Sequence, residues 1–117
     1  MNSNPKKMRV AVIGCGIAGL LTAKSALEND FEVVVFEKNP DIGGIWSPGG
    51  HAWPHMKANI SKFSFNFTDF QWNDILEMFP SKTQVFEYFL EYCKVFGLLP
   101  YIRFNSRIKL VKMLGFN

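Results

Sequence analysis

Three glycines in one short run are the first residues of this chain that could hold a ligand. Gly14, Gly16 and Gly19 have the spacing Gly-x-Gly-x-x-Gly. In that spacing the first glycine permits a tight turn, the second lets a diphosphate approach the backbone, and the third lets a helix pack closely on a strand. An acid, Glu37, follows about 20 residues later, where a carboxylate can accept hydrogen bonds from ribose hydroxyls. The set predicts a dinucleotide site.

These residues can act together only if a strand, a helix and a second strand position them. Residues 9–13 (RVAVI) and 31–36 (FEVVVF) are apolar, β-branched runs that are typical of buried parallel strands. Between them, Leu20, Ala23 and Leu27 keep helical spacing. The predicted fold class is therefore α/β, a Rossmann-like βαβ unit with a parallel sheet. An acid after the second strand would repel a 2′-phosphate, so the site favours FAD or NAD over NADP.

The amino-terminal region allows other interpretations. The glycines could form only a tight turn in another α/β protein. Cys15 occupies a variable position of that turn, which favours a passive role over that of a catalytic thiol. Lys6, Lys7 and Arg9 precede an apolar run and resemble a signal peptide, but the glycine spacing and the following strand argue against one.

A second constellation follows the acid. Gly43 and Gly44 would let the backbone pass close to a bulky cofactor, and Ile45 and Trp46 could line a flavin ring or its ribityl chain. A glycine turn beside a buried tryptophan explains the same residues equally well. The surrounding loop, residues 38–57, is long for a compact domain, and long ordered loops are usually functional.

The second half of the chain predicts further elements. Phe63, Phe65 and Phe67 alternate with polar residues, which indicates a strand or an extended segment with one buried face. A capping box at Ser81–Gln84 opens a helix that should end at Gly97. Two short strands are expected at 101–104 and 108–113. The apolar stripe of the helix consists of Val85, Phe86, Phe89, Leu90, Cys93 and Phe96.

Composition narrows the classes of protein. The chain has 117 residues, 48% of them hydrophobic, so it fits one small domain with a core. The net charge is +3, but basic residues do not alternate with aromatics along one helix, which argues against nucleic acid. The two cysteines and two histidines lack metal-site spacing. No apolar run reaches the ~18 residues of a membrane span, and an intracellular, reducing location is expected.

Several motifs lie along residues 9–113. They are Glu37-Lys38 with Gly43–Trp46 ("F-E-[KR]…G-G-x-W"), Ala58–Lys62 ("T-N-x-S-K"), Phe67–Phe70 ("F-x-D-[FY]"), and the helix 81–97 with 102–105 ("Y…Y-x-x-x-F-x-L…I-x-F"). Together and in register, they resemble signatures of the flavin-containing monooxygenases. Ala58 stands where that family usually has Thr or Ser.

This resemblance implies roles for individual residues. Asn59 would be the catalytic side chain, donating from its amide to oxygen on the flavin; taken alone, Asn59 fits an Asx turn better. Glu37 would bind the adenosine ribose. The residues implied in cofactor binding are Gly14, Cys15, Gly16, Ile17, Ala18, Gly19, Glu37, Lys38, Gly44, Ile45, Trp46, Ala58, Asn59 and Ile60, and no metal ligand is implied.

The resemblance also implies an activity. Members of this family use NADPH to reduce FAD, add O2 to form a C4a-hydroperoxyflavin, and transfer one oxygen atom to a soft nucleophile, usually N or S, or insert it beside a ketone. Full members are several times longer and carry a second glycine-rich motif for NADPH. Residues 1–117 are therefore expected to form a partial FAD/NAD(P)-binding domain, without the NADPH domain and the carboxy-terminal part. Weak FAD retention, no turnover by this polypeptide alone, and poorly packed phenylalanine faces are expected. Any membrane association, for example with the endoplasmic reticulum, would come from a missing carboxy-terminal segment.

Two alternatives remain from the sequence. One is a truncated, non-catalytic flavin-binding remnant. The other is a different flavoprotein oxidoreductase with two dinucleotide sites. A disulfide reductase would need a C-x-x-C pair, which this chain lacks, and amine oxidases usually place Arg after the glycine pair, where this chain has Ile45 and Trp46.

Overall fold

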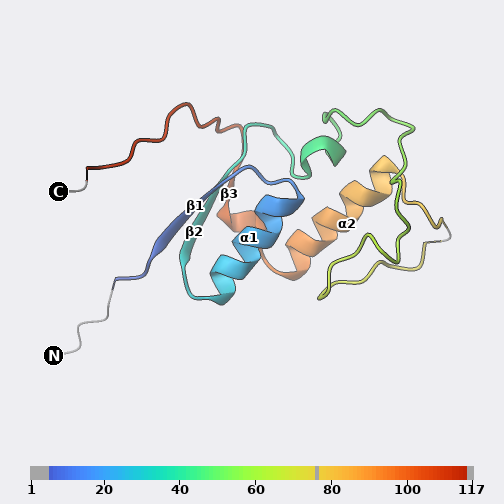
Figure 1. The fold of residues 1–117 in the computed structure, drawn as a ribbon, viewed down its shortest axis with the longest axis horizontal. Coiled ribbons are helices and arrows are strands. Elements are labelled where there is room, and N and C mark those ends of the chain that lie inside the picture. Colours follow the sequence, from blue (N-terminus) through green and yellow to red (C-terminus); the bar gives the residue numbers. More distant parts are fainter. Residues whose placement is uncertain (1–5, 76, 116–117) are drawn as a thin grey trace.

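A three-stranded parallel sheet lies beside two helices in the computed structural model, which describes residues 6–75 and 77–115 (Figure 1). The strand order is β1-β2-β3, and α1 connects β1 to β2, so the predicted α/β class and its βαβ unit are confirmed. The elements are β1 (Arg9–Ile13), α1 (Ile17–Glu28), β2 (Glu32–Phe36), the 3-10 turn η1 (Gly44–Trp46), α2 (Lys82–Val95), the 3-10 turn η2 (Leu99–Tyr101) and β3 (Ile102–Arg103).

The sheet places the ends of its strands side by side. β1 and β2 pair over five residues each, from Arg9 opposite Glu32 to Ile13 opposite Phe36. β3 is much shorter, with Ile102 opposite Val35 and Arg103 opposite Phe36. Because all three strands are parallel, the turn after β1 and the acid after β2 meet at one edge of the sheet.

The second helix follows its sequence signals closely. The Ser81 hydroxyl accepts from Gln84 N at 3.2 Å, and Ser81 N donates to Gln84 Oε1 at 2.9 Å, which completes the predicted capping box. Gly97 lies just beyond the helix with φ +65°, the left-handed conformation of a helix stop. On the buried face Tyr88 and Tyr92 join the predicted stripe.

Replacing Ser81 by Ala should lower the free energy of unfolding by about 1 kcal/mol, because the amide of Gln84 loses its acceptor. Urea unfolding followed by circular dichroism measures this change. Thr83→Ala is the control, since Thr83 is exposed in the first turn and outside the capping box. Equal losses for the two variants would contradict a stabilising cap.

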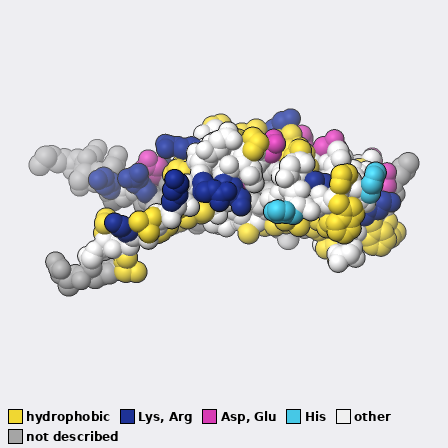
Figure 2. Space-filling model, turned by 90° about the horizontal axis from the view of Figure 1, so that it is seen from above, with side chains coloured by type: hydrophobic (Ala, Val, Ile, Leu, Met, Phe, Trp, Pro, Cys, Tyr) yellow, Lys and Arg dark blue, Asp and Glu magenta, His cyan; other side chains and the backbone are white. Residues whose placement is uncertain are grey.

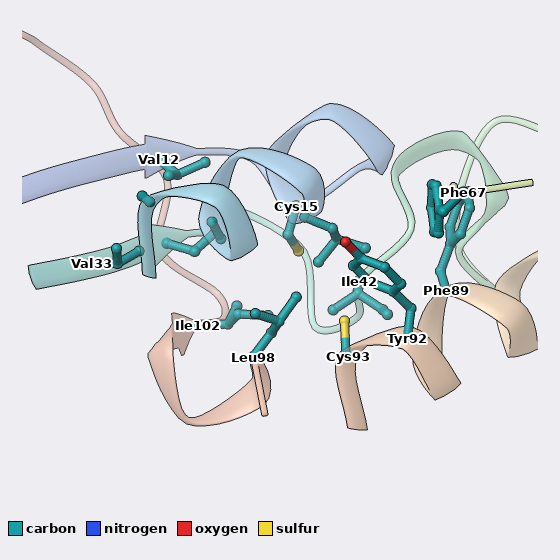
Figure 3. Close-up of a cluster of buried hydrophobic side chains, with 14 of the residues drawn as sticks. Val12, Cys15, Val33, Ile42, Phe67, Phe89, Tyr92, Cys93, Leu98 and Ile102 are labelled. Atoms are coloured by element: carbon teal, nitrogen blue, oxygen red, sulfur yellow. The ribbon is translucent and has the colours of Figure 1, made fainter. Parts of the chain in front are cut away.

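One core joins the βαβ unit to α2. Cys15 of the glycine turn and Ile42 of the following loop lie beside Tyr92 and Cys93 of α2 (Figure 3). All four side chains are almost completely buried. The turn that carries the glycines therefore packs on α2, an element about 65 or more residues later in the chain. Loops are positioned by the scaffold on which they pack.

The expectation that the phenylalanine faces are poorly packed is wrong for the most part. Phe65, Phe67 and Phe70 pack on the aromatic face of α2, with ring centroids 4.5 Å apart for Phe67 and Tyr92. Trp72 stacks on Tyr88 at 4.0 Å. Such pairs stabilise beyond the area they bury. The aromatic residues form a core within the described chain, although Phe63 and Phe79 remain exposed.

Two predicted strands do not form. Residues 63–67 follow turns, because Ser64 N and Phe65 N both donate back to Ser61 O and Tyr88 Oη accepts from Phe67 N at 2.9 Å. A side chain of α2 thus takes the place of a neighbouring strand. Residues 108–113 are exposed and outside any sheet, and of the expected strand at 101–104 only the two residues of β3 remain. A strand needs a partner for its backbone groups, and alternation alone does not supply one.

The surface is uneven in charge. Lys and Arg side chains gather beside the two chain ends, and hydrophobic side chains are concentrated toward the opposite end of the same view (Figure 2). The basic residues Arg103, Arg107, Lys109 and Lys112 all lie on the last part of the chain. Across the described residues, no helix is both long and apolar enough to cross a membrane.

Candidate dinucleotide-binding site

The glycine turn connects β1 to α1 at the sheet edge. Gly14 has φ +94°, a conformation that favours glycine, and its amide donates to Phe36 O at 2.8 Å. Gly16 is the N-cap of α1 in an extended conformation. A Cβ at Gly19 would lie 2.9 Å from the Gly14 carbonyl carbon and would overlap its oxygen. The first and third glycines therefore have the structural roles predicted from their spacing.

The beginning of α1 offers unpaired donors to a ligand. The first hydrogen bond of the helix runs from Leu20 N to Gly16 O at 3.0 Å, so the amides of Ile17, Ala18 and Gly19 have no acceptor within the helix. No acid stands in the first turn of α1, so the positive end of its dipole has no neighbouring carboxylate within that turn. Amides and dipole together suit a diphosphate.

Glu37 points back at the glycine turn from the end of β2. Its Oε1 accepts from Cys15 N at 3.0 Å, and its Oε2 accepts from Asn39 N at 2.8 Å. Glu37 is only 5% exposed. An ionised carboxylate has about four acceptor positions, and Glu37 also accepts from Cys15 Sγ at 3.4 Å, so little acceptor capacity is left over. The acid thus fixes the turn, and its contact with a ribose stays a prediction.

Cys15 has no sign of a reactive thiol. Burial, followed by the charge of the Glu37 carboxylate and the Sγ hydrogen bond to it, raises the pKa of Cys15 well above its ordinary range. Thiolate is the nucleophilic form. The structure therefore supports the predicted passive role, which is to pack the turn onto α2.

The buried thiols give a prediction for alkaline pH. Burial raises the pKa of Cys93 to about 12, and the pKa of Cys15 is raised as well. Above pH ~8.5 the unfolded chain releases thiol protons that the folded chain retains. The free energy of unfolding should therefore fall as pH rises above that value, and native alkylation should be slow. The rates of iodoacetamide labelling in buffer and in urea check the predicted slow alkylation of the folded chain. Equally fast labelling in both would contradict the burial of the thiols.

The glycine pair after the acid packs directly on the first turn. Gly43 N donates to Cys15 O at 2.9 Å, and Gly43 and Gly44 have φ +105° and +58°. A Cβ at Gly44 would come within 3.3 Å of Gly16 Cα, so the two backbones touch. Ile45 is half exposed beside them. The two constellations found in the sequence therefore lie against each other.

Trp46 is tied to the aromatic core. It is partly buried and meets Phe65 edge-to-face at 6.1 Å. Both interpretations of this segment thus keep support, because the glycine pair does form a turn beside a partly buried tryptophan. Of Ile45 and Trp46, Ile45 is the residue whose side chain is exposed and could contact a ligand.

The segment of Asn59 is attached through α2 instead of through the glycine turn. Ala58 is buried, and its amide donates to Pro80 O at 2.8 Å, next to the backbone bridge of Lys57 with Ser81. Asn59 and Ile60 are exposed. Lys38 is exposed as well, beyond the acid. Their contacts with a cofactor stay predictions.

Sequence patterns missed one buried charge near the site. Lys82, the first residue of α2, is 8% exposed and donates to the carbonyl of Ala52 at 2.6 Å. A lysine in a capping-box sequence is normally a solvated residue. No local spacing signals that its partners are backbone carbonyls 30 residues earlier.

Neither a metal-ligand cluster nor the cavity beside α2 suggests a different location for the site among the described residues. The described part of the chain holds no cluster of His, Cys, Asp and Glu that could bind a metal ion. An open cavity lies between the 70–75 segment and α2, lined by Trp72, Tyr88 and Leu90 among others. Its lining is separate from the glycine turn and from Glu37.

Known proteins with similar sequences match nearly the whole of this chain. The model of the family "Flavin-binding monooxygenase-like" matches residues 7–115. Flavin-containing monooxygenase 5 of Oryctolagus cuniculus is 43% identical over 111 residues, which are 89% of this chain and 21% of that protein. Flavin-containing monooxygenase 3 of Homo sapiens is 34% identical over 110 residues, 88% of this chain and 21% of that protein. The chain thus spans about a fifth of the length of these relatives.

Solved structures share the fold. A flavin-containing monooxygenase from Stenotrophomonas maltophilia has a TM-score of 0.78 at 21% identity, covering 95% of this chain and 32% of that one. S-allyl-L-cysteine S-oxygenase from Allium sativum has a TM-score of 0.77 at 21% identity, covering 86% of this chain and 28% of that one. The family model covers nearly the whole chain, and the solved structures share its fold. This chain therefore belongs to the flavin-binding monooxygenase-like family.

Proposed function

We propose that this chain provides the FAD-binding part of a flavin-dependent monooxygenase that uses NADPH and oxygenates soft nucleophiles at N or S. The observation that carries the proposal is the contact of three backbone segments at one sheet edge. Glu37 Oε1 accepts from Cys15 N in the glycine turn. Gly43 N, in the Gly43–Gly44 turn, donates to Cys15 O.

The residues present fit the diphosphate and ribose of FAD. The open amides at the beginning of α1 would hold the diphosphate, and the space beside Gly14 is free, because a Cβ there would meet nothing within 4 Å. Glu37 would accept from the ribose hydroxyls while it keeps its bond to Cys15 N. The bound flavin would supply the redox and oxygen-transfer chemistry.

The remaining residues would orient the flavin and its reaction. Ile45 and Trp46 would line the ring or ribityl chain, and Lys38 would lie near the adenosine end. Ala58 and Ile60 would contribute backbone near the reactive edge. Asn59 would donate from its side-chain amide to an oxygen that gains negative charge, a stabilisation that works best where water is excluded.

Retention of FAD by these residues alone should be weak. β1 pairs only with β2 in the described sheet, and Ile13 at the end of β1 is 60% exposed. Parallel sheets are normally covered on both faces. Binding energy that depends on a closed site would be missing, so we expect no NADPH oxidation by the isolated chain.

A pair of nucleotides tests the proposal. Calorimetric titration should give a measurable Kd for ADP-ribose and an affinity at least about tenfold lower for its 2′-phosphorylated analogue, because Glu37 repels the added charge. FAD should bind in competition with ADP-ribose. Equal affinity for the two ribose forms, or FAD binding that ADP-ribose does not displace, would overturn the assignment of the site.

A further inference from the structure

Lys82 is a buried cation in an unfavourable place. It is the first residue of α2, where the helix dipole disfavours positive charge, and it is nearly inaccessible to solvent. A buried ammonium needs compensating partners. Among the residues that the structure describes, no carboxylate lies within ion-pair distance of Lys82.

Three backbone carbonyls supply that compensation. Lys82 Nζ donates to Ala52 O at 2.6 Å and to Pro48 O and Gly50 O, each at 3.4 Å. An ammonium has three N–H donors and no acceptor, so three converging carbonyls equal its donors in number, with the close bond to Ala52 O and longer contacts to the other two. The segment 48–52 therefore wraps around a positive charge that α2 supplies.

The wrapped segment continues into the glycine-pair turn as one hydrogen-bonded unit. Ala52 N donates to Ile45 O at 3.0 Å, and Gly50 N donates to Ser47 O at 2.9 Å. The Ser47 hydroxyl donates to Gly44 O at 2.9 Å. A side chain at position 50 would collide with the carbonyl oxygens of Gly44 and Ile45, so the packing is close.

This unit lies against the glycine turn, through Gly43 N to Cys15 O and the close approach of Gly44 to Gly16. The beginning of α2 also holds the segment before Asn59, because Lys82 N donates to Met56 O at 3.0 Å. A single helix terminus thus connects two parts of the site.

We propose that Lys82 is a positioning residue whose ammonium, held in the carbonyl cage of residues 48, 50 and 52, fixes the 44–52 segment against the glycine turn. The consequence for cofactor binding rests on the proposed function, whereas the tether itself does not. Loss of the ammonium should loosen residues 44–52 while the βαβ unit stays folded, since β1, α1 and β2 make no bond to Lys82.

Hydrogen exchange of the chain without ligand tests the tether directly. In Lys82→Met, amides of residues 44–52 should exchange about tenfold faster or more, the effect of losing a charged hydrogen bond. Amides of β1 and β2 should keep their protection. Lys94→Met is the matched control, an exposed lysine on the same helix. Equal exchange of residues 44–52 in the two variants would overturn the proposal.

Chemical rescue separates the cation from the space it fills. Propylammonium has the three carbons and the nitrogen that Lys82→Ala removes, and it should restore protection of residues 44–52. Tetramethylammonium has the charge but no N–H donor, and it should not. If Lys82→Met loses protection in every segment, the rescue decides: recovery with propylammonium alone supports the cage, and equal behaviour of the two ions overturns it.

FAD affinity provides the last test. If the proposed function holds, Lys82→Met should weaken FAD binding by about tenfold or more, and Lys94→Met should leave it unchanged. If the wild-type chain binds no FAD, the proposed function fails while the exchange result still decides the tether. If FAD binds equally well to Lys82→Met with residues 44–52 loosened, the positioning role is overturned.

Discussion

Gly19→Ala should lower the free energy of unfolding by about 3 kcal/mol or more and abolish nucleotide binding, although alanine is a better helix former than glycine. The new Cβ would overlap the Gly14 carbonyl, and backbone on both sides cannot move aside as a flexible side chain could. To accommodate it, α1 must move away from β1. That movement would displace the amides that face the diphosphate. Urea unfolding and ADP-ribose titration measure the two effects.

Gly49→Ala is the matched control. A Cβ there meets nothing within 4 Å, and Gly49 has no positive φ. The free energy of unfolding of this variant should lie within about 0.5 kcal/mol of the wild-type value, as is usual for surface substitutions. If Gly19→Ala behaved like Gly49→Ala, the close packing of α1 on the glycine turn would be refuted.

Glu37→Ala should cost about 2–4 kcal/mol of stability and reduce affinity for ADP-ribose by about 100-fold. The amides of Cys15 and Asn39 would lose their acceptor in a buried place, and each unsatisfied donor costs about 1–3 kcal/mol. The binding loss adds the missing ribose acceptor, since about 1.4 kcal/mol corresponds to a factor of ten. Thermal unfolding and calorimetric titration separate the two contributions.

Glu32→Ala provides the comparison for that variant. Glu32 begins the same strand, but its side chain is exposed. Its removal should leave both stability and nucleotide affinity nearly unchanged. A Glu37→Ala chain that binds ADP-ribose as tightly as Glu32→Ala would show that the acid supports the turn without contacting the sugar.

The sequence by itself determined the local parts of this protein. The βαβ unit, the glycine turn and the capping box at Ser81 each depend on residues a few positions apart, whose backbone preferences and hydrogen bonds act within one element. Glu37 was also predictable, because a carboxylate at the end of the second strand has a fixed place in this arrangement. In these regions local preference and tertiary fold agree.

Only the tertiary structure decided the rest, because the decisive partners lie far apart along the chain. The alternating phenylalanines near residue 65 predicted a strand or an extended segment with one buried face. No strand forms there, because the Tyr88 hydroxyl accepts from Phe67 N and the rings of Phe65 and Phe67 pack on α2. The expected strand at 108–113 has no neighbour to pair with among the described residues. Lys82 shows the same limit most clearly: residue type and local pattern place it in solvent, while three carbonyls from a distant loop bury it beside the site. Side-chain periodicity records which face is apolar, but it cannot specify which remote backbone group will satisfy a buried donor.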